Sequence, residues 1–135
     1  NHQNAAAMLI ANASCLCLAA EMGHHDTVKT LLDMRAPVDA QDENSNTALQ
    51  LACLNGHYEV IQTLVSRGAN VNTRNHASRT PLHQAAQFGS LDVVQYLLEK
   101  GAATNVHNFQ RNSPLHIAAQ GGHALVAKAL LLKDS

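Results

Sequence analysis

Apolar and polar positions along the chain follow a pattern that repeats at regular intervals. Four apolar-rich segments align without a gap in a 33-residue period, and they begin at Ser14, Thr47, Thr80 and Ser113. A second apolar segment follows each of them, with the helical spacing seen over residues 91–98 (LDVVQYLL). Because this spacing places the apolar side chains on one face, the pattern predicts four pairs of amphipathic helices that stack on one another.

Start and stop signals mark the first helix of each pair. The Ser or Thr at its start is expected to cap the helix by accepting a bond from an unpaired backbone N–H. Pro81 and Pro114 come next, at the first helical position, where a missing N–H costs nothing. Glycine is expected to end each helix because it readily adopts a positive φ. These residues are Gly23, Gly56, Gly89 and Gly122.

The sequence TPLHQAA from Thr80, the Gly-His pair at Gly56 and the sequence GANVN from Gly68 resemble the ankyrin repeat. The resemblance covers residues 9–135. It implies an all-α solenoid of helix–turn–helix units with short β-hairpin fingers projecting at right angles to the helices. A unit this short cannot bury its own apolar face, so such a fold depends on stacked neighbours.

The family's phase divides the single domain 1–135 into a partial N-terminal cap and four repeats. The cap is expected at 1–8 and the repeats at 9–41, 42–74, 75–107 and 108–135, the last of them truncated. The first repeat departs from the family pattern, with Leu9 where an Asp would begin the finger. The finger glycine is also replaced, which predicts less ideal turns at Ser45, Ser78 and Arg111.

Composition favours a reduced, intracellular and cytoplasmic protein. Three cysteines show no framework spacing, and we expect no secretory leader. The apolar runs are far shorter than the ~20 residues that a membrane helix needs. The sequence begins with Asn1 rather than Met, which indicates a segment of a larger protein.

The charge is small in total but uneven along the chain. A formal net charge of −1 predicts no nucleic-acid partner and no membrane partner. Residues 1–43 hold two basic and six acidic residues, whereas residues 44–135 hold seven basic and four acidic ones. The two ends of the molecule are therefore expected to differ electrostatically.

The histidines favour structural roles over metal binding. They recur one period apart in two slots of the repeat, whereas metal ligands must converge on one point. The resemblance implies that such side chains bond to nearby backbone or to the capping Thr. The residues in these slots are His24, His57, His83, His116 and His123.

Cysteine and serine patterns indicate no reaction chemistry. Cys15, Cys17 and Cys53 are expected to be free, buried thiols, because no second pair completes a four-ligand site. Neither a G-x-S-x-G motif nor a Gly-rich phosphate loop occurs. We therefore predict no catalytic residue, no cofactor and no metal.

Asn72 and Asn105 admit two interpretations. In ankyrin repeats, an Asn at this turn position can be hydroxylated by an asparaginyl hydroxylase, and Leu64 and Val71 fit the sequence before such a site. Asn70 stands where an acid is usual, which weakens the match. The favoured interpretation is that the Asn side chain stabilises its own turn.

The resemblance also implies where a partner would bind. Ankyrin domains generally bind through finger tips and through exposed positions of the first helices, which together line a concave face. The matching positions in this chain are Gln41, Glu43, Asn44, Asn46, Leu54, Asn55, Arg74, His76, Arg79, Gln87, Phe88, His107, Phe109, Gln110 and Asn112.

Phe88 and Phe109 are expected to lie within reach of one another. Basic side chains near them would then form an apolar centre rimmed by positive charge, and aromatic and Arg side chains often dominate binding energy. A protein or peptide with an acidic segment around an apolar anchor would suit this patch. The alternative is that both rings are ordinary surface residues. The rim residues are Arg74, His76, Arg79 and His107.

The sequence therefore predicts a monomeric protein–protein interaction module that presents a concave surface to a macromolecular partner, within a larger intracellular protein. The alternative is a structural spacer, or a substrate-recruitment segment of a larger enzyme or of a longer repeat array. The apolar run Leu130–Leu132 fits that alternative, since a further repeat would normally cover it.

Overall fold

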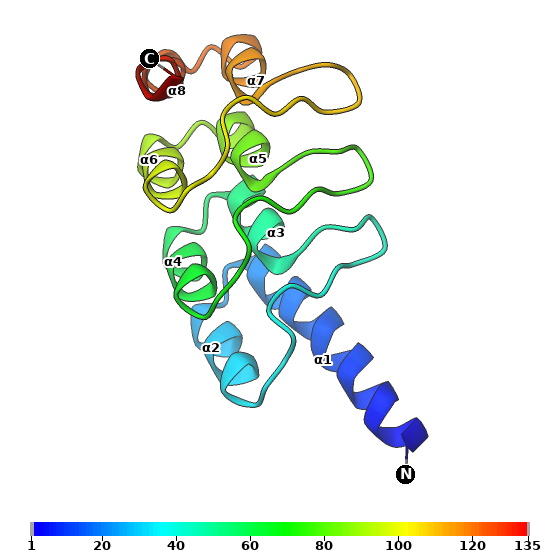
Figure 1. The fold of residues 1–135 in the computed structure, drawn as a ribbon. Helices are drawn as coiled ribbons and strands as arrows, with labels where there is room; N and C mark the ends of the chain where they lie inside the picture. The colour runs from blue at the N-terminus through cyan, green and yellow to red at the C-terminus, as the bar shows by residue number, and fades with distance from the viewer. Residues whose placement is uncertain (1, 135) are drawn as a thin grey trace.

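The chain folds as a helical repeat solenoid of two layers, as predicted (Figure 1). The computed structural model describes residues 2–134, with side chains for residues 11–133. The inner layer contains α1 (His2–Met22), α3 (Ala48–Asn55), α5 (Pro81–Phe88) and α7 (Pro114–Gln120). The outer layer contains α2 (His25–Asp33), α4 (Tyr58–Ser66), α6 (Leu91–Glu99) and α8 (Ala124–Asp134).

The inner helices begin at the predicted caps in three of the four repeats. At Thr47, Thr80 and Ser113 the side chain accepts a bond from the backbone N–H three residues later, and that later side chain bonds back to the cap. This reciprocal pair satisfies two otherwise orphan donors. Gly56 and Gly89 then end α3 and α5 in the left-handed conformation, with φ of 72° and 89°.

Small and branched apolar side chains fill the space between the layers. Leu49 and Leu82 are fully buried on the inner helices, and Ile61 and Leu97 are fully buried on the outer ones. Burying a side chain of this kind stabilises the fold by about 1.5–3 kcal/mol. The apolar core is continuous across the repeats, so each repeat depends on its neighbours.

The first repeat differs from the prediction, because α1 is one helix from His2 to Met22. Residues 9–13, expected in a finger, are helical, and Ser14 lies exposed inside the helix instead of capping it. The sequence before Ser14 is rich in Ala, with Leu and Met, and contains neither Gly nor Pro. Leu9 stands where an Asp or Asn begins the turn of the other fingers, so the helix is favoured over a turn.

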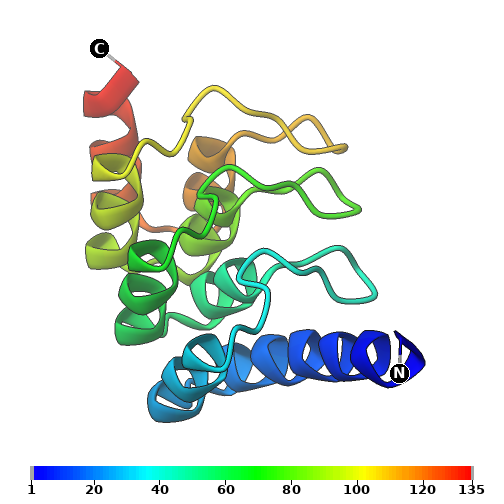
Figure 2. The same cartoon turned by 60° about the horizontal axis from the view of Figure 1, so that its bottom comes forward.

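The three fingers of the later repeats project to the same side of the stack, and α1 extends along that side as well (Figure 2). In the first finger, Gln41 and Thr47 form an isolated antiparallel bridge. The fingers and inner helices thus border one face of the molecule, with α1 at one end and α7 at the other, and a cleft lies near each end. We call this face the groove. Within residues 2–134, no helix has the length and apolar character needed to cross a membrane.

Side chains of the outer turns join consecutive repeats. The Asp39 carboxylate accepts a bond from the Asn70 N–H at 3.0 Å, and the Asn72 side-chain oxygen accepts one from the Ala103 N–H at 2.9 Å. The Asn72 amide also donates to the Gly101 carbonyl at 3.2 Å. The Asn72 side chain therefore ties its turn to the next one, and the expectation that it stabilises its own turn is wrong. Within that turn, the Asn70 side-chain oxygen accepts the bond from the Asn72 N–H at 2.9 Å.

Candidate functional site

Each finger turns around an Asp or Asn side chain at the same position of the repeat. The side-chain oxygens of Asp42, Asn75 and Asn108 accept bonds from the backbone N–H groups two and four residues later, at 2.8–3.0 Å. These bonds hold a positive φ at a residue that is not glycine, which would otherwise be strained. The residues in this conformation are Ser45 (62°), Ser78 (60°) and Arg111 (65°).

Backbone bonds link each finger tip to the next. The His76 N–H donates to the Asn44 carbonyl at 3.1 Å, and the Phe109 N–H donates to the Ala77 carbonyl at 3.0 Å. The three tips therefore form a row whose spacing is set by the backbone. Side chains at the tips can differ without a change in that spacing.

A second row of bonds joins each inner helix to the base of the next finger. The donors occupy one position of the repeat, and the acceptors are carbonyls at another single position of it. The pairs are Cys17 Sγ to Asn46 at 4.0 Å, Gln50 Nε2 to Arg79 at 2.8 Å and His83 Nε2 to Asn112 at 2.9 Å. The finger bases are thereby fixed to the helices that border the groove.

His83 is held neutral by its surroundings. Its Nδ1 accepts a bond from the Thr80 N–H at 3.1 Å, while its Nε2 donates to the Asn112 carbonyl. Burial lowers the pKa of His83 to about 4, and the charges of Arg79 and Arg74 act in the same direction, against the bond to Asn112. The imidazole is therefore a fixed structural bridge at neutral pH.

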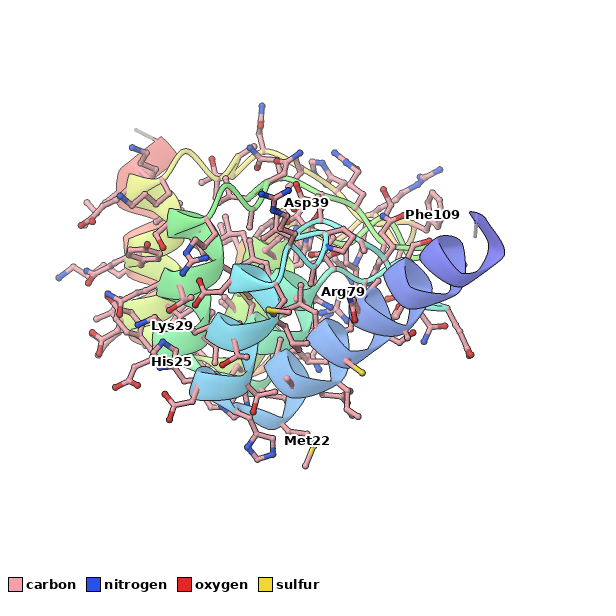
Figure 3. The ribbon with its side chains drawn as sticks, turned by 90° about the horizontal axis from the view of Figure 1, so that it is seen from below. Met22, His25, Lys29, Asp39, Arg79 and Phe109 are labelled. Atoms are coloured by element: carbon pink, nitrogen blue, oxygen red, sulfur yellow. The ribbon has the colours of Figure 1, made fainter. Side chains whose placement is uncertain are left out.

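Most of the side chains predicted to bind a partner are exposed on the fingers and inner helices. The half-buried ones are Leu54, Asn46, Arg79 and Asn112. The exposed ones are Gln41, Glu43, Asn44, Asn55, Arg74, His76, Gln87, Phe88, His107, Phe109 and Gln110. Figure 3 shows Arg79 and Phe109 on the finger side of the molecule, away from His25 and Lys29 of the outer layer.

The expected contact between Phe88 and Phe109 is wrong. Phe88 ends α5 and packs on the backbone of Gly56, where an added Cβ would lie 2.3 Å from its ring. Phe109 lies at the tip of the last finger, beside Ala77, and is 77% exposed. The length of α5, roughly 12 Å at 1.5 Å per residue, separates the two places, so no shared apolar centre forms.

Phe88 has a structural partner that the repeat pattern explains. His57 packs on Gly23 and His123 packs on Gly89, each covering the glycine of the preceding repeat. Ser90 occupies this histidine's slot in the third repeat, and Phe88 covers Gly56 in its place. The Phe88 ring is thus partly covered by its packing on Gly56.

Four of the five histidines bond as the resemblance implied, whereas His24 makes no such side-chain bond among the described residues. His57 and His123 bond through Nε2 to the carbonyls of Glu21 and Gln87, at 3.0 and 3.2 Å. His116 accepts a bond from the Ser113 N–H at 3.1 Å.

The cysteines divide into two groups. Cys53 is fully buried and Cys17 nearly so, as expected, but Cys15 is exposed on α1, so its predicted burial is wrong. Cys15 points outward because Leu16 occupies the core-facing position next to it, where the helix meets α3. Burial raises the pKa of Cys17 to about 11, with the charges of Asp42 and Glu21 adding to the shift.

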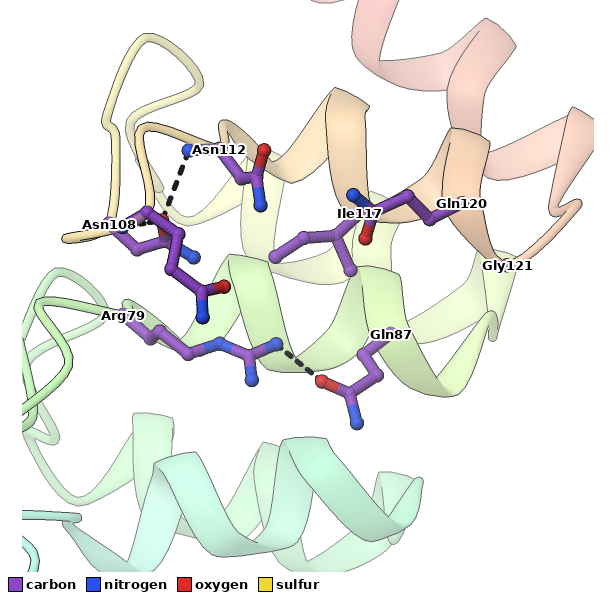
Figure 4. A pocket seen from close by; sticks show the side chains of 8 residues that line it. Arg79, Gln87, Asn108, Asn112, Ile117, Gln120 and Gly121 are labelled. Atoms are coloured by element: carbon purple, nitrogen blue, oxygen red, sulfur yellow. Dashed lines mark hydrogen bonds between the residues drawn. The ribbon is translucent and has the colours of Figure 1, made fainter.

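A polar cleft of about 360 Å³ lies in the groove between the third and fourth repeats (Figure 4). Amide side chains dominate its walls, together with one guanidinium group and one apolar side chain. The lining residues are Arg79, Gln87, Asn108, Gln110, Asn112, Ile117, Gln120 and Gly121.

Arg79 is the charged group of this cleft. Its side chain lies along the floor below Ile117, and one of its terminal nitrogens donates to the side-chain oxygen of Gln87. Its Nε is buried and has no acceptor in the described part of the chain. A buried donor left without a partner costs about 1–3 kcal/mol, and burial also lowers the pKa of this guanidinium.

The opposite end of the groove is acidic. A smaller cleft of about 250 Å³ lies between α1 and the first finger, and Glu21, Asp42 and Glu43 line it together with Leu18 and Leu51. The charge difference expected between the two ends of the chain is thus present along the groove.

Sequence reasoning missed several side chains that line these clefts, among them Glu21, Asn108 and Ile117. Ile117 shares its repeat position with Leu51 and Gln84, so one aligned column could have marked it as a groove position. Asn108 could have been found in the same way, from its alignment with Asp42 and Asn75. Glu21 could have been found too, because it shares its repeat position with Leu54 and Gln87, which were among the predicted binding residues.

Models of ankyrin repeats match almost the whole chain. Models for multiple ankyrin repeats match residues 16–65 and 64–118, and the model of the single ankyrin repeat matches residues 110–135. No curated protein matches the chain.

Proposed function

Since the chain belongs to the ankyrin repeat family, we propose that it binds a protein or peptide partner along the groove between its fingers and inner helices. Ankyrin repeats are in general protein–protein interaction modules, and their fold is non-catalytic. The proposal assigns the chain a binding role and no reaction chemistry, as a monomeric module of a larger intracellular protein.

The observation that carries the proposal is the cleft between the third and fourth repeats. Its amide side chains offer both donors and acceptors, and Arg79 adds a half-buried positive charge. Protein interfaces combine such groups with a buried centre, and Arg is enriched in them. The concave face therefore has polar bonding capacity that the fold itself leaves unused.

The partner proposed from the sequence needs one revision. An acidic segment remains supported, because Arg79 lies in the cleft and Arg74 lies near it. An apolar anchor between Phe88 and Phe109 is not supported, because the two rings lie apart. Phe109 alone, at the tip of the last finger, remains an exposed aromatic that a partner could cover.

The test is to fill the cleft and compare which proteins the chain captures. Gln110→Tyr with Gln120→Tyr places two large, uncharged side chains in the cleft. Gln62→Tyr with Gln95→Tyr makes the same chemical change on exposed positions of the outer helices. We expect proteins captured from a cell extract by the unmodified chain to be lost with the cleft variant and kept with the outer variant.

The alternative function, a spacer within a longer array, is supported by a different observation. Leu125, Leu131 and Leu132 of α8 are 65%, 55% and 65% exposed, and such a face suits a packed neighbour. If the cleft variant and the outer variant capture the same proteins, the groove is not the binding surface and the spacer is favoured.

A further inference from the structure

Arg79 is a half-buried positive charge in the cleft, and no acidic side chain pairs with it among the described residues. Among the described residues, the ion pairs join Arg67 to Asp33 and His25 to Asp26 and Glu59, and none includes Arg79. Within the part of the chain that the structure describes, its only side-chain bond goes to the neutral Gln87, and its buried Nε has no acceptor. A guanidinium presents its N–H groups in a fork that matches the two oxygens of a carboxylate.

The surroundings of Arg79 add positive charge and no negative charge. The cleft is lined by amides, by Ile117 and by Gly121, without an acid. Arg74 lies close by and bonds to the His107 carbonyl at 3.3 Å. The combined field of Arg79, Arg74 and His107 is felt at His83, where each lowers the imidazole pKa. An anion entering the cleft therefore meets a positive potential without a competing carboxylate.

The backbone indicates which kind of carboxylate fits. A terminal carboxylate is usually captured by a nest of unpaired backbone N–H groups. In this cleft those groups are taken: the N–H groups of Gln110 and Asn112 donate to Asn108, and that of Gly121 donates to Ile117. The inner helix and finger of the second repeat continue the same face beyond the cleft (Figure 1), which favours a segment that runs on past its carboxylate over one that ends there.

Resting on the proposed function, we propose that the cleft binds the side-chain carboxylate of a Glu or Asp in an extended segment of the partner. The carboxylate accepts bonds from the terminal nitrogens of the Arg79 guanidinium, because its Nε is closed off from the cleft. The side-chain amides of Gln110, Asn112 and Gln120 are placed to bond with the segment's backbone. Arg79 therefore requires a Glu or Asp at one fixed position of the bound segment.

The experiment selects binders from a library of random 12-residue peptides displayed on phage. The baits are the unmodified chain, Arg79→Gln, Arg79→Glu and the control Lys29→Glu. Lys29 is exposed on α2 of the outer layer, so its reversal changes the net charge as Arg79→Glu does, but away from the groove (Figure 3). Thermal melts followed by circular dichroism check each fold, and Arg79→Gln carries the test if Arg79→Glu fails to fold.

We expect Glu or Asp to be enriched at one position with the unmodified chain and with Lys29→Glu. The enrichment is lost with Arg79→Gln and is replaced by Lys or Arg with Arg79→Glu. A selected peptide, synthesised with an amidated C-terminus, then binds Arg79→Gln at least about 30-fold more weakly than the unmodified chain. Changing its Glu to Gln gives the same loss, and the two changes together give no more.

Three outcomes overturn the inference, and they are distinguishable. If the unmodified chain and Arg79→Glu select peptides of equal acid content, the cleft does not read a carboxylate, while groove binding stands. If amidation of the C-terminus abolishes binding, the carboxylate is a terminal one and the assigned source is wrong. If no bait selects any peptide, groove binding of peptides itself fails, and this inference fails with it.

Discussion

The first and third repeats have aligned sequences but build their inner helices differently. In the third, the finger turns around Asn75, and Thr80 then caps α5 with its side chain. In the first, Leu9 occupies the position of Asn75, no finger forms, and Ser14 lies inside α1. A capping residue therefore caps only where the chain before it turns, and that turn depends on an Asp or Asn side chain.

The difference also affects packing. In the third repeat nearly every side chain of α5 is buried, from Pro81 to Ala86. In the first, Leu18 and Met22 are 60% and 58% exposed on α1. We therefore expect substitutions to destabilise the third repeat much more than the first, and the following variants test this in order of decreasing effect.

The largest contrast is expected between Leu82→Ala and Leu18→Ala. Leu82 is fully buried, so its truncation leaves a cavity and should cost about 2–5 kcal/mol in the free energy of unfolding. Leu18 is mostly exposed, and its truncation should cost no more than about 0.5 kcal/mol. Urea unfolding followed by circular dichroism measures both. Equal losses would show that the face of α1 carrying Leu18 is covered in solution.

The pH dependence of stability should distinguish the repeats as well. His83 has a folded-state pKa of about 4 against 6.5 in the unfolded chain, so the unfolded chain takes up the proton first. The neutral His83 therefore contributes fully to the free energy of unfolding above pH 6.5. This contribution, up to roughly 3 kcal/mol, is lost as the pH falls toward 4.

The variant His83→Gln introduces the residue found at the same position of the second repeat, where the Gln50 side chain bonds to the next finger as His83 does. Between pH 6.5 and 4 it should lose less stability than the unmodified chain does, measured by urea unfolding at each pH. His116→Gln, at an exposed position of the fourth repeat, is the control and should leave the pH profile as it is. A profile unchanged in His83→Gln would mean that other groups cause the acid loss.

A smaller contrast is expected between the aligned caps. Thr80→Ala removes a side chain that completes a capping box and should cost about 1 kcal/mol. Ser14→Ala replaces an exposed residue inside a helix by the best helix former, so stability should stay the same or rise by about 0.5 kcal/mol. Thermal melts of both variants provide the comparison. A matching loss in Ser14→Ala would indicate that α1 begins at Ser14 in solution.

The smallest effects concern Phe88 and its aligned residue Met22. Phe88→Ala uncovers Gly56 and should cost under about 1 kcal/mol, because its ring is already 49% exposed. Met22→Ala should stay within about 0.5 kcal/mol. Chemical unfolding measures both, and Phe109→Ala, at an exposed finger tip, provides the baseline. If Phe88→Ala equals that baseline, the contact with Gly56 adds nothing to stability.

The repeating sequence pattern was sufficient to predict the two-layer stack, three of the four caps and the exposed finger positions. These features depend on local signals, such as the Thr and Pro before α5, that act the same way in every repeat. The long α1 was missed because the aligned pattern extended a finger over residues 9–13, which begin with Leu9 instead of the Asp or Asn on which the other fingers turn.

The cleft could be predicted only in part. Arg79, Gln87, Gln110 and Asn112 were found by their repeat positions, but the unpaired Nε of Arg79 depends on how the side chain lies below Ile117. Phe88 and Phe109 lie apart because Phe88 is the last residue of α5, whereas Phe109 lies beside Ala77, before the first residue of that helix. A repeat alignment states which positions are equivalent, but it does not state how far apart they lie in neighbouring repeats.

The backbone bonds between finger tips also have a mechanical consequence. They cross the junctions between the second and third repeats and between the third and fourth, as His76 to Asn44 and Phe109 to Ala77. At the first junction α1 takes the place of a finger, and the inner edge holds the weak Cys17 thiol contact. If the two ends were pulled apart, the junctions would carry the load in series. At the first junction the load would pass instead to the packing of α1 on α3 and to the Arg67–Asp33 ion pair, so the finger edge would open there before the helices separate.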